Sequence, residues 1–81
     1  MKTFGSVAGD AFTITPSDTT NFDKMTDAIF IGGAGNIAVV KKDGTAITFT
    51  GVIAGQVLPI NAIRVNSTGT TATNLVGLTY N

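Results

Sequence analysis

The sequence predicts an all-β fold, a small antiparallel β-sandwich or barrel of about seven short strands. Short apolar-rich runs recur at close spacing, and turn residues separate them. Fourteen of the 81 residues are threonine, which favours strands. All five acidic residues are aspartate, which favours turns and caps over helix interiors. Together these observations favour strands over helices along the chain.

The expected strands follow one another without a visible repeat, linker or second domain. In the first, Ala11–Thr15, the apolar residues Phe12 and Ile14 alternate with threonines. Residues 1–9 are expected to form a flexible N-terminal arm, and residues 10–81 a single β domain. The remaining expected strands are Thr26–Ile31, Asn36–Lys42, Thr45–Thr50, Gln56–Ile60, Ala62–Asn66 and Asn74–Tyr80.

The pair Asp43-Gly44 lies between two of these runs and predicts a β-hairpin. A type I′ turn is expected, because glycine takes positive φ without strain and aspartate tolerates it. In the strand that follows, Ile47 and Phe49 are expected on the buried face of a half-buried sheet. Pro59 places its run at an edge or a bend, since proline cannot donate to a sheet ladder.

The glycine run Gly32–Gly35 resembles, in its spacing, the fingerprint of a dinucleotide-binding loop. That loop needs a helix after the glycines and an acid about 20 residues further on. Here a β-branched run follows, and no acid lies beyond Asp43. The sequence therefore predicts a tight turn between two adjacent antiparallel strands, with Asn36 tolerating a left-handed conformation.

The residue types exclude several classes of function. The chain has no cysteine and no histidine, which removes thiolate chemistry and the commonest general base. Its five basic residues form no long run, whereas a nucleic-acid binder normally carries a basic stripe. The longest apolar runs have four residues, against about 20 for a membrane span. We expect no enzyme, no catalytic, cofactor or metal site, and neither nucleic acid nor a membrane as partner.

The composition predicts a protein partner. Hydrophobic residues make up 43% of the chain and charged residues 12%, about half the usual charged fraction. A domain of this size buries only roughly 60% of its unfolded surface. The remaining apolar surface is expected to be covered in an oligomer or by a larger partner. The N-terminus lacks the apolar core of a signal peptide, which suggests assembly in the cytoplasm.

An ordered set of short motifs covers residues 16–78. The motifs are Pro16–Thr20, Ala28–Gly35, Asp43–Thr45, Thr48–Val52, Ala54-Gly55, Leu58-Pro59, Arg64-Val65 and Thr68–Thr73. In this order they resemble a family of small phage-type virion proteins, which includes the head-spike base protein of gene transfer agents and related capsid decoration proteins.

The resemblance implies a non-enzymatic structural role on a phage or phage-like particle. It implies a homo-oligomer, a trimer or a pentamer, docked on the major capsid protein as decoration, cement or spike base. A spike or fibre protein is a further expected partner. The expected location is the capsid exterior of the virion, after assembly in the host cytoplasm.

Five residues are expected at interfaces: Lys2, Phe4, Leu58, Ile60 and Arg64. Lys2 and Phe4 belong to the arm, which could instead be a frayed terminus. Leu58 and Ile60 flank the edge proline, and the alternative for them is plain core. Arg64 is the lone charge of the second half of the chain and could simply solvate a strand face.

A carbohydrate-binding β-sandwich for host-surface adhesion is the alternative function. Sugar sites usually offer aromatic rings for stacking, yet the chain has no tryptophan and one tyrosine, Tyr80. Binding to capsids but not to glycans would separate the two hypotheses.

Overall fold

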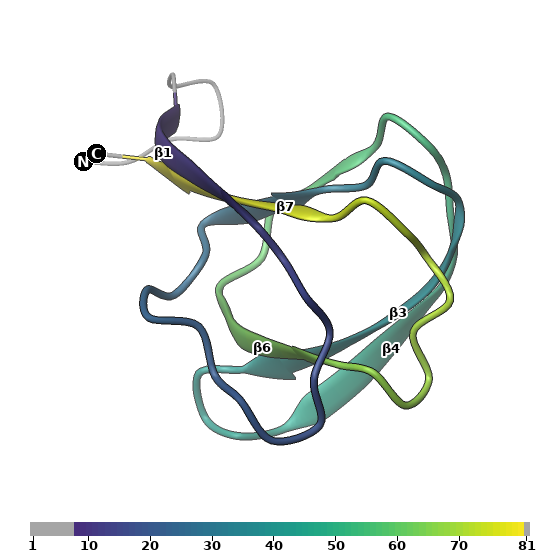
Figure 1. The fold of residues 1–81 in the computed structure, drawn as a ribbon, viewed down its shortest axis with the longest axis horizontal. Helices are drawn as coiled ribbons and strands as arrows, with labels where there is room; N and C mark the ends of the chain where they lie inside the picture. Colours follow the sequence, from purple (N-terminus) through teal and green to yellow (C-terminus); the bar gives the residue numbers. More distant parts are fainter. Residues whose placement is uncertain (1–7, 81) are drawn as a thin grey trace.

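The structure is a computed structural model, and it describes residues 8–80. These residues form two antiparallel sheets that face each other (Figure 1). The four-stranded sheet has the order β1-β7-β2-β5, and the three-stranded sheet has the order β4-β3-β6. Within residues 8–80 the strands are β1 (Ala8–Thr13), β2 (Ala28–Phe30), β3 (Gly35–Lys41), β4 (Ala46–Val52), β5 (Val57–Leu58), β6 (Ala62–Asn66) and β7 (Val76–Tyr80). The predicted all-β fold is confirmed.

The core lies between the two sheets and consists mainly of aliphatic side chains. Ile29 of β2 and Val39 of β3 are fully buried, and Val65 of β6 joins them. Phe12, Phe49, Leu58 and other half-buried apolar residues pack against this cluster. Ile29 and Phe30 point to opposite faces, as the alternation predicts, because successive side chains of a strand alternate. The part of the chain that the structure describes contains no helix long and apolar enough to cross a membrane.

The strand boundaries differ from the prediction at the N-terminus. β1 begins at Ala8 and ends at Thr13, whereas the sequence pattern placed the strand over Ala11–Thr15. The pairing of β1 with β7 begins at Ala8↔Tyr80, and this long-range partner extends the strand into residues that carry no alternation of their own. The predicted burial still holds, since Ile14 is buried and Thr13 is exposed.

The predicted hairpin between β3 and β4 is confirmed, but the type I′ turn is wrong. Gly44 N–H donates to Lys41 O at 2.9 Å, and Gly44 takes φ of 89°. Asp43 does not have positive φ, and its Oδ1 accepts from Thr45 N–H at 2.9 Å. The loop is therefore a three-residue connection with one left-handed glycine, the next most common hairpin class.

The glycine run is also not a turn between paired strands, because β2 and β3 lie in different sheets. Gly33 instead forms an isolated antiparallel bridge with Thr73, and Gly32 N–H donates to Asn74 O at 3.1 Å. A Cβ on Gly32 would lie 2.5 Å from Asn74 O. The glycines are therefore needed for the close approach of two backbones at the crossing between the sheets.

The expected left-handed asparagine is also displaced. Asn36 lies in the extended strand β3. Among residues 8–80, the one non-glycine residue with positive φ is Asn74, at 52°. The left-handed conformation is therefore taken by Asn74, in the segment opposite the glycines. Asparagine tolerates this conformation better than most residues.

The long segment between β1 and β2 ties the two sheets together. Thr26 is fully buried, donates its hydroxyl to Ile60 O at 2.9 Å and accepts from Ala62 N–H at 3.0 Å. Earlier in the segment, Ser17 N–H donates to Val65 O and Phe22 N–H to Ile63 O. This segment therefore covers the outer edge of β6, which would otherwise present unpaired backbone groups.

Candidate functional site

The structure places Leu58, Ile60 and Arg64 in different surroundings. Leu58 and Ile60 are half-buried and pack against the core cluster. Leu58 pairs with Ile29, so β5 is the edge strand that Pro59 predicted. For these two apolar side chains the structure supports the alternative of core packing more than that of a free contact surface.

Arg64 is half-buried and bound within its own chain. Its Nε donates to Asn66 Oδ1 at 3.0 Å, and its Nη1 donates to Asn21 Oδ1 at 3.1 Å. The guanidinium therefore fastens β6 to the segment that covers its edge. Lys2 and Phe4 lie outside the described residues.

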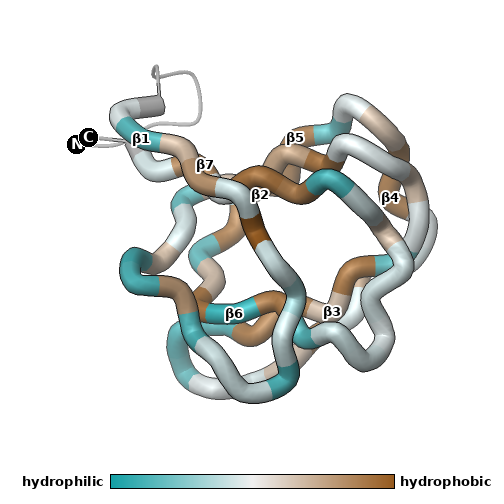
Figure 2. Tube along the Cα trace, viewed as in Figure 1, coloured by the Kyte–Doolittle hydropathy of each residue, from teal (hydrophilic) through white to brown (hydrophobic). Residues whose placement is uncertain are grey.

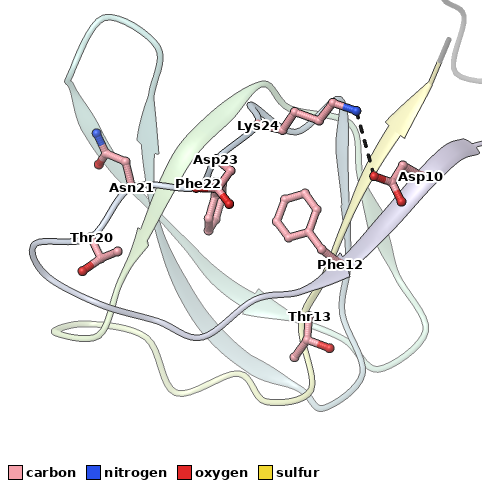
Figure 3. Close-up of a pocket in the computed structure, with 8 residues that line it drawn as sticks. All are labelled: Asp10, Phe12, Thr13, Thr20, Asn21, Phe22, Asp23 and Lys24. Atoms are coloured by element: carbon pink, nitrogen blue, oxygen red, sulfur yellow. Dashed lines mark ion pairs between the residues drawn. The ribbon is translucent and has the colours of Figure 1, made fainter.

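Next to this segment lies a groove with a volume of about 480 Å³ (Figure 3). One wall is β1, and the other is the segment 20–24. The lining residues are Asp10, Phe12, Thr13, Thr20, Asn21, Phe22, Asp23 and Lys24. The sequence analysis did not identify this site, because its two walls are brought together only by the tertiary fold.

Two aromatic rings form the floor of the groove. Phe12 and Phe22 meet edge-to-face, with ring centroids 5.3 Å apart and an interplanar angle of 64°. The Phe12 ring also lies across Gly77, its partner residue on β7, where a Cβ would come within 2.5 Å of the ring. The absence of a side chain at Gly77 therefore positions Phe12. The pairing of Phe12 with Gly77 could not be predicted from the sequence, because it depends on the register between β1 and β7.

Charged groups stand at the rim of the groove. Lys24 Nζ lies 3.9 Å from Asp10 Oδ2, and both side chains are more than half exposed, so this ion pair adds little stability. Asp23 is exposed and has no hydrogen bond or ion pair with any of residues 8–80. The groove thus combines apolar rings with a net negative rim.

A second candidate surface is the outer face of the four-stranded sheet. Val76, Phe30 and Val57 lie side by side in one row across β7, β2 and β5, and Phe30 remains 37% exposed. The turn that carries Ile53, 64% exposed, is bound to the end of β2 through Gly55 N–H and Ile31 O. We call Phe30, Ile53, Val57 and Val76 the apolar patch. Figure 2 shows hydrophobic segments gathered where β7, β2 and β5 meet.

The edge strand β4 was expected to be half-buried, and it is mostly exposed. Ile47 faces the same side as its partner Val39, yet it is 44% exposed. The direction of its side chain was predicted correctly, but the opposite sheet does not extend over this edge. β4 has no charged residue or proline, the usual devices that protect an edge strand.

Two of the acidic residues, Asp18 and Asp43, accept hydrogen bonds from backbone N–H groups. Thr68 N–H donates to Asp18 Oδ1 at 2.9 Å and lowers the pKa of that carboxyl below its ordinary value. Thr45 N–H lowers the pKa of Asp43 in the same way. Groups held ionised in this manner make poor proton donors. Within residues 8–80, no three aspartates gather in a way that could hold a metal ion.

A solved structure described as "Capsid of native GTA particle computed with C5 symmetry" contains a similar chain. GTA denotes a gene transfer agent. The two chains share 36% identity over 96% of this chain and 90% of the other, with a TM-score of 0.84. No protein-family model and no curated protein matches the sequence. The match supports a virion structural protein. This chain therefore belongs to the same family as that chain of the gene transfer agent capsid, a phage-like capsid-associated protein.

Proposed function

We propose that this protein is a homo-oligomeric subunit docked on the outer surface of a phage-like capsid, as a decoration protein or a head-spike base. The observation that carries the proposal is the 36% identity to a gene transfer agent capsid chain across 96% of the sequence. The TM-score of 0.84 shows that the two chains also share the fold over this length.

The exposed apolar residues support an assembled state. Ile53, Ile47 and Phe30 keep between 64% and 37% of their surface exposed in the isolated chain. Residues 44–63 carry no charge, so copies of this surface meet without like-charge repulsion. The edge of β4 offers a further contact, because an unprotected edge strand readily pairs with another chain. In a capsid, neighbouring proteins would cover both the exposed apolar side chains and the edge of β4.

A ring of subunits fits the symmetry of a particle, because a closed ring must match the axis on which it stands. The similar chain belongs to a particle whose structure was computed with fivefold symmetry. A pentamer would match a fivefold axis at a vertex, where a spike or fibre protein could be mounted. A trimer would suit a local threefold position between major capsid proteins.

The proposed role requires no chemistry, and we propose that the protein is not an enzyme. The carbohydrate-binding alternative has less support. A sugar would need an open ring face for stacking, whereas Phe12 is half-buried, lies on Gly77 and meets Phe22 edge-to-face.

Native mass spectrometry over a wide range of protein concentration tests the oligomeric part of the proposal. We expect one closed species, of five or three copies, that persists on dilution. A strict monomer at every concentration would contradict a preformed ring and would remove the support that the exposed apolar surface gives.

A further inference from the structure

We infer that the groove between β1 and segment 20–24 receives the N-terminal residues Met1–Phe4 of a neighbouring copy. The inference rests on the proposed function, because it names the contact by which copies associate. The occupant is a segment of this same chain, and the argument uses the groove's chemistry and the reach of the chain.

The groove and the segment are chemically complementary. Met1–Phe4 carries the terminal amine, the Lys2 ammonium and one phenylalanine, and it has no acid. The groove offers the carboxylate of Asp23, which has no partner among residues 8–80, beside two aromatic rings. A third ring added to the pair Phe12–Phe22 would extend the edge-to-face packing that is already present. Lys2 would supply a cation to Asp23, which has none beside it among residues 8–80.

The geometry favours a neighbouring copy over the chain's own groove. From Ala8 to Phe12, β1 spans about 13 Å. Phe4 precedes Ala8 by four residues, which extend at most about 14 Å. A reversal of direction uses at least two of these residues in a turn. The Cα of Phe4 in the same copy therefore comes back only to about the level of Asp10, two residues short of Phe12.

A neighbouring copy is within reach. Residues 1–7 extend about 25 Å when stretched. The body of the protein measures 33 × 25 × 18 Å, so this reach equals its intermediate dimension. Because β1 also forms one wall of the groove, each copy would give its segment to the next copy and receive one from the previous copy. Such a head-to-tail contact closes into a ring when the rotation between copies permits.

A disulfide trap tests the inference directly, because the chain has no cysteine of its own. Phe4→Cys combined with Thr20→Cys places one thiol on the segment and one in the groove. Under mild oxidation we expect covalent multimers on a non-reducing gel. The matched control pairs Phe4→Cys with Ala34→Cys, an exposed position in the glycine run away from the groove and from β4, and should yield little cross-linked product.

A charge exchange gives an independent test that does not depend on disulfide geometry. Asp23→Lys should weaken association of the copies, and Asp23→Lys combined with Lys2→Asp should restore it. Phe4→Ala should raise the dissociation constant of the oligomer about tenfold, the usual effect of losing an aromatic anchor.

Three outcomes would overturn the inference. The first is an intramolecular disulfide in the monomer. The second is a ring that forms without cross-linking and whose stability does not change with Phe4→Ala. The third is a capsid that shields Thr20→Cys from labelling although the copies do not cross-link. In the second and third cases the proposed capsid role would stand. A protein that is monomeric in solution and absent from particles would overturn both.

Discussion

Asp18 and Thr68, fifty positions apart in sequence, are joined by two hydrogen bonds. Thr68 N–H donates to Asp18 Oδ1 at 2.9 Å, and the Thr68 hydroxyl donates to Asp18 Oδ2 at 2.7 Å. The pair fastens the segment between β1 and β2 to the turn between β6 and β7. The backbone hydrogen bond from Thr68 is the main cause of the lowered pKa of Asp18.

Replacing Asp18 by asparagine should make stability less dependent on pH. The pKa of Asp18 in the folded protein is below its ordinary value of 3.8, so the carboxylate stabilises the fold above that pH. The contribution is lost as the pH falls through the lowered pKa. The difference in free energy of unfolding between the wild type and Asp18→Asn should be constant near neutrality and vanish in strong acid.

Urea denaturation at a series of pH values measures this difference. Thr68→Val provides the matched control, because it keeps the backbone N–H and removes the hydroxyl. In the double variant the two effects should be less than additive. An Asp18→Asn difference that persists unchanged in strong acid would contradict the assignment.

Thr26→Val should destabilise the fold by about 1–3 kcal/mol, because Ile60 O and Ala62 N–H would both lose their partner in a buried place. Thr26→Ser keeps the hydroxyl and removes a methyl group, at a cost of about 1 kcal/mol. Denaturant unfolding measures both. Thr26→Val as stable as the wild type would show that the hydroxyl does not bridge the sheets.

Gly32→Ala should destabilise the fold, since the new Cβ would lie 2.5 Å from Asn74 O and 2.6 Å from Asn74 Cβ. Backbone must move to relieve the clash, and overpacking of this kind costs about 1–3 kcal/mol. Ala34→Ser, at an exposed position in the same run, is the matched control and should change stability little. Equal stability of Gly32→Ala and the wild type would contradict the close approach of the two segments.

Ile53→Asp should lower incorporation of the protein into particles about tenfold while leaving the fold intact, because a charge in an apolar contact costs more than 1 kcal/mol. Ile53 is 64% exposed, so the isolated chain should tolerate the change. Thr15→Asp adds the same charge at another exposed position and is the control. The amount of protein that copurifies with particles measures the effect, and incorporation at the wild-type level would remove the apolar patch from the contact.

The sequence predicts local features of this fold better than its long-range pairings. The alternation around Ile29 and Phe30 identifies the buried face of β2, and Pro59 identifies an edge. The glycine run was assigned to a turn because its true partner, Thr73, lies forty residues away. Ile47 was expected to be buried because alternation gives the direction of a side chain and not the extent of the opposite sheet.

The candidate sites depend on tertiary contacts even more than the strand pairing does. The groove unites Phe12 with Phe22 across a fold that no local pattern shows, and Arg64 is held by Asn21 from the same distant segment. The surplus of apolar residues did indicate uncovered surface, and the exposed side chains of Phe30, Ile47 and Ile53 are part of it. Which residues carry that surface could not be predicted without the register of the strands.

The most direct test of the central claim is electron cryo-microscopy of capsids that lack this protein, before and after addition of the purified chain. We expect added density on the outer surface at a symmetry axis, in which five or three copies of the two-sheet fold can be placed. Capsids that remain bare at saturating protein would contradict the assignment to the capsid exterior.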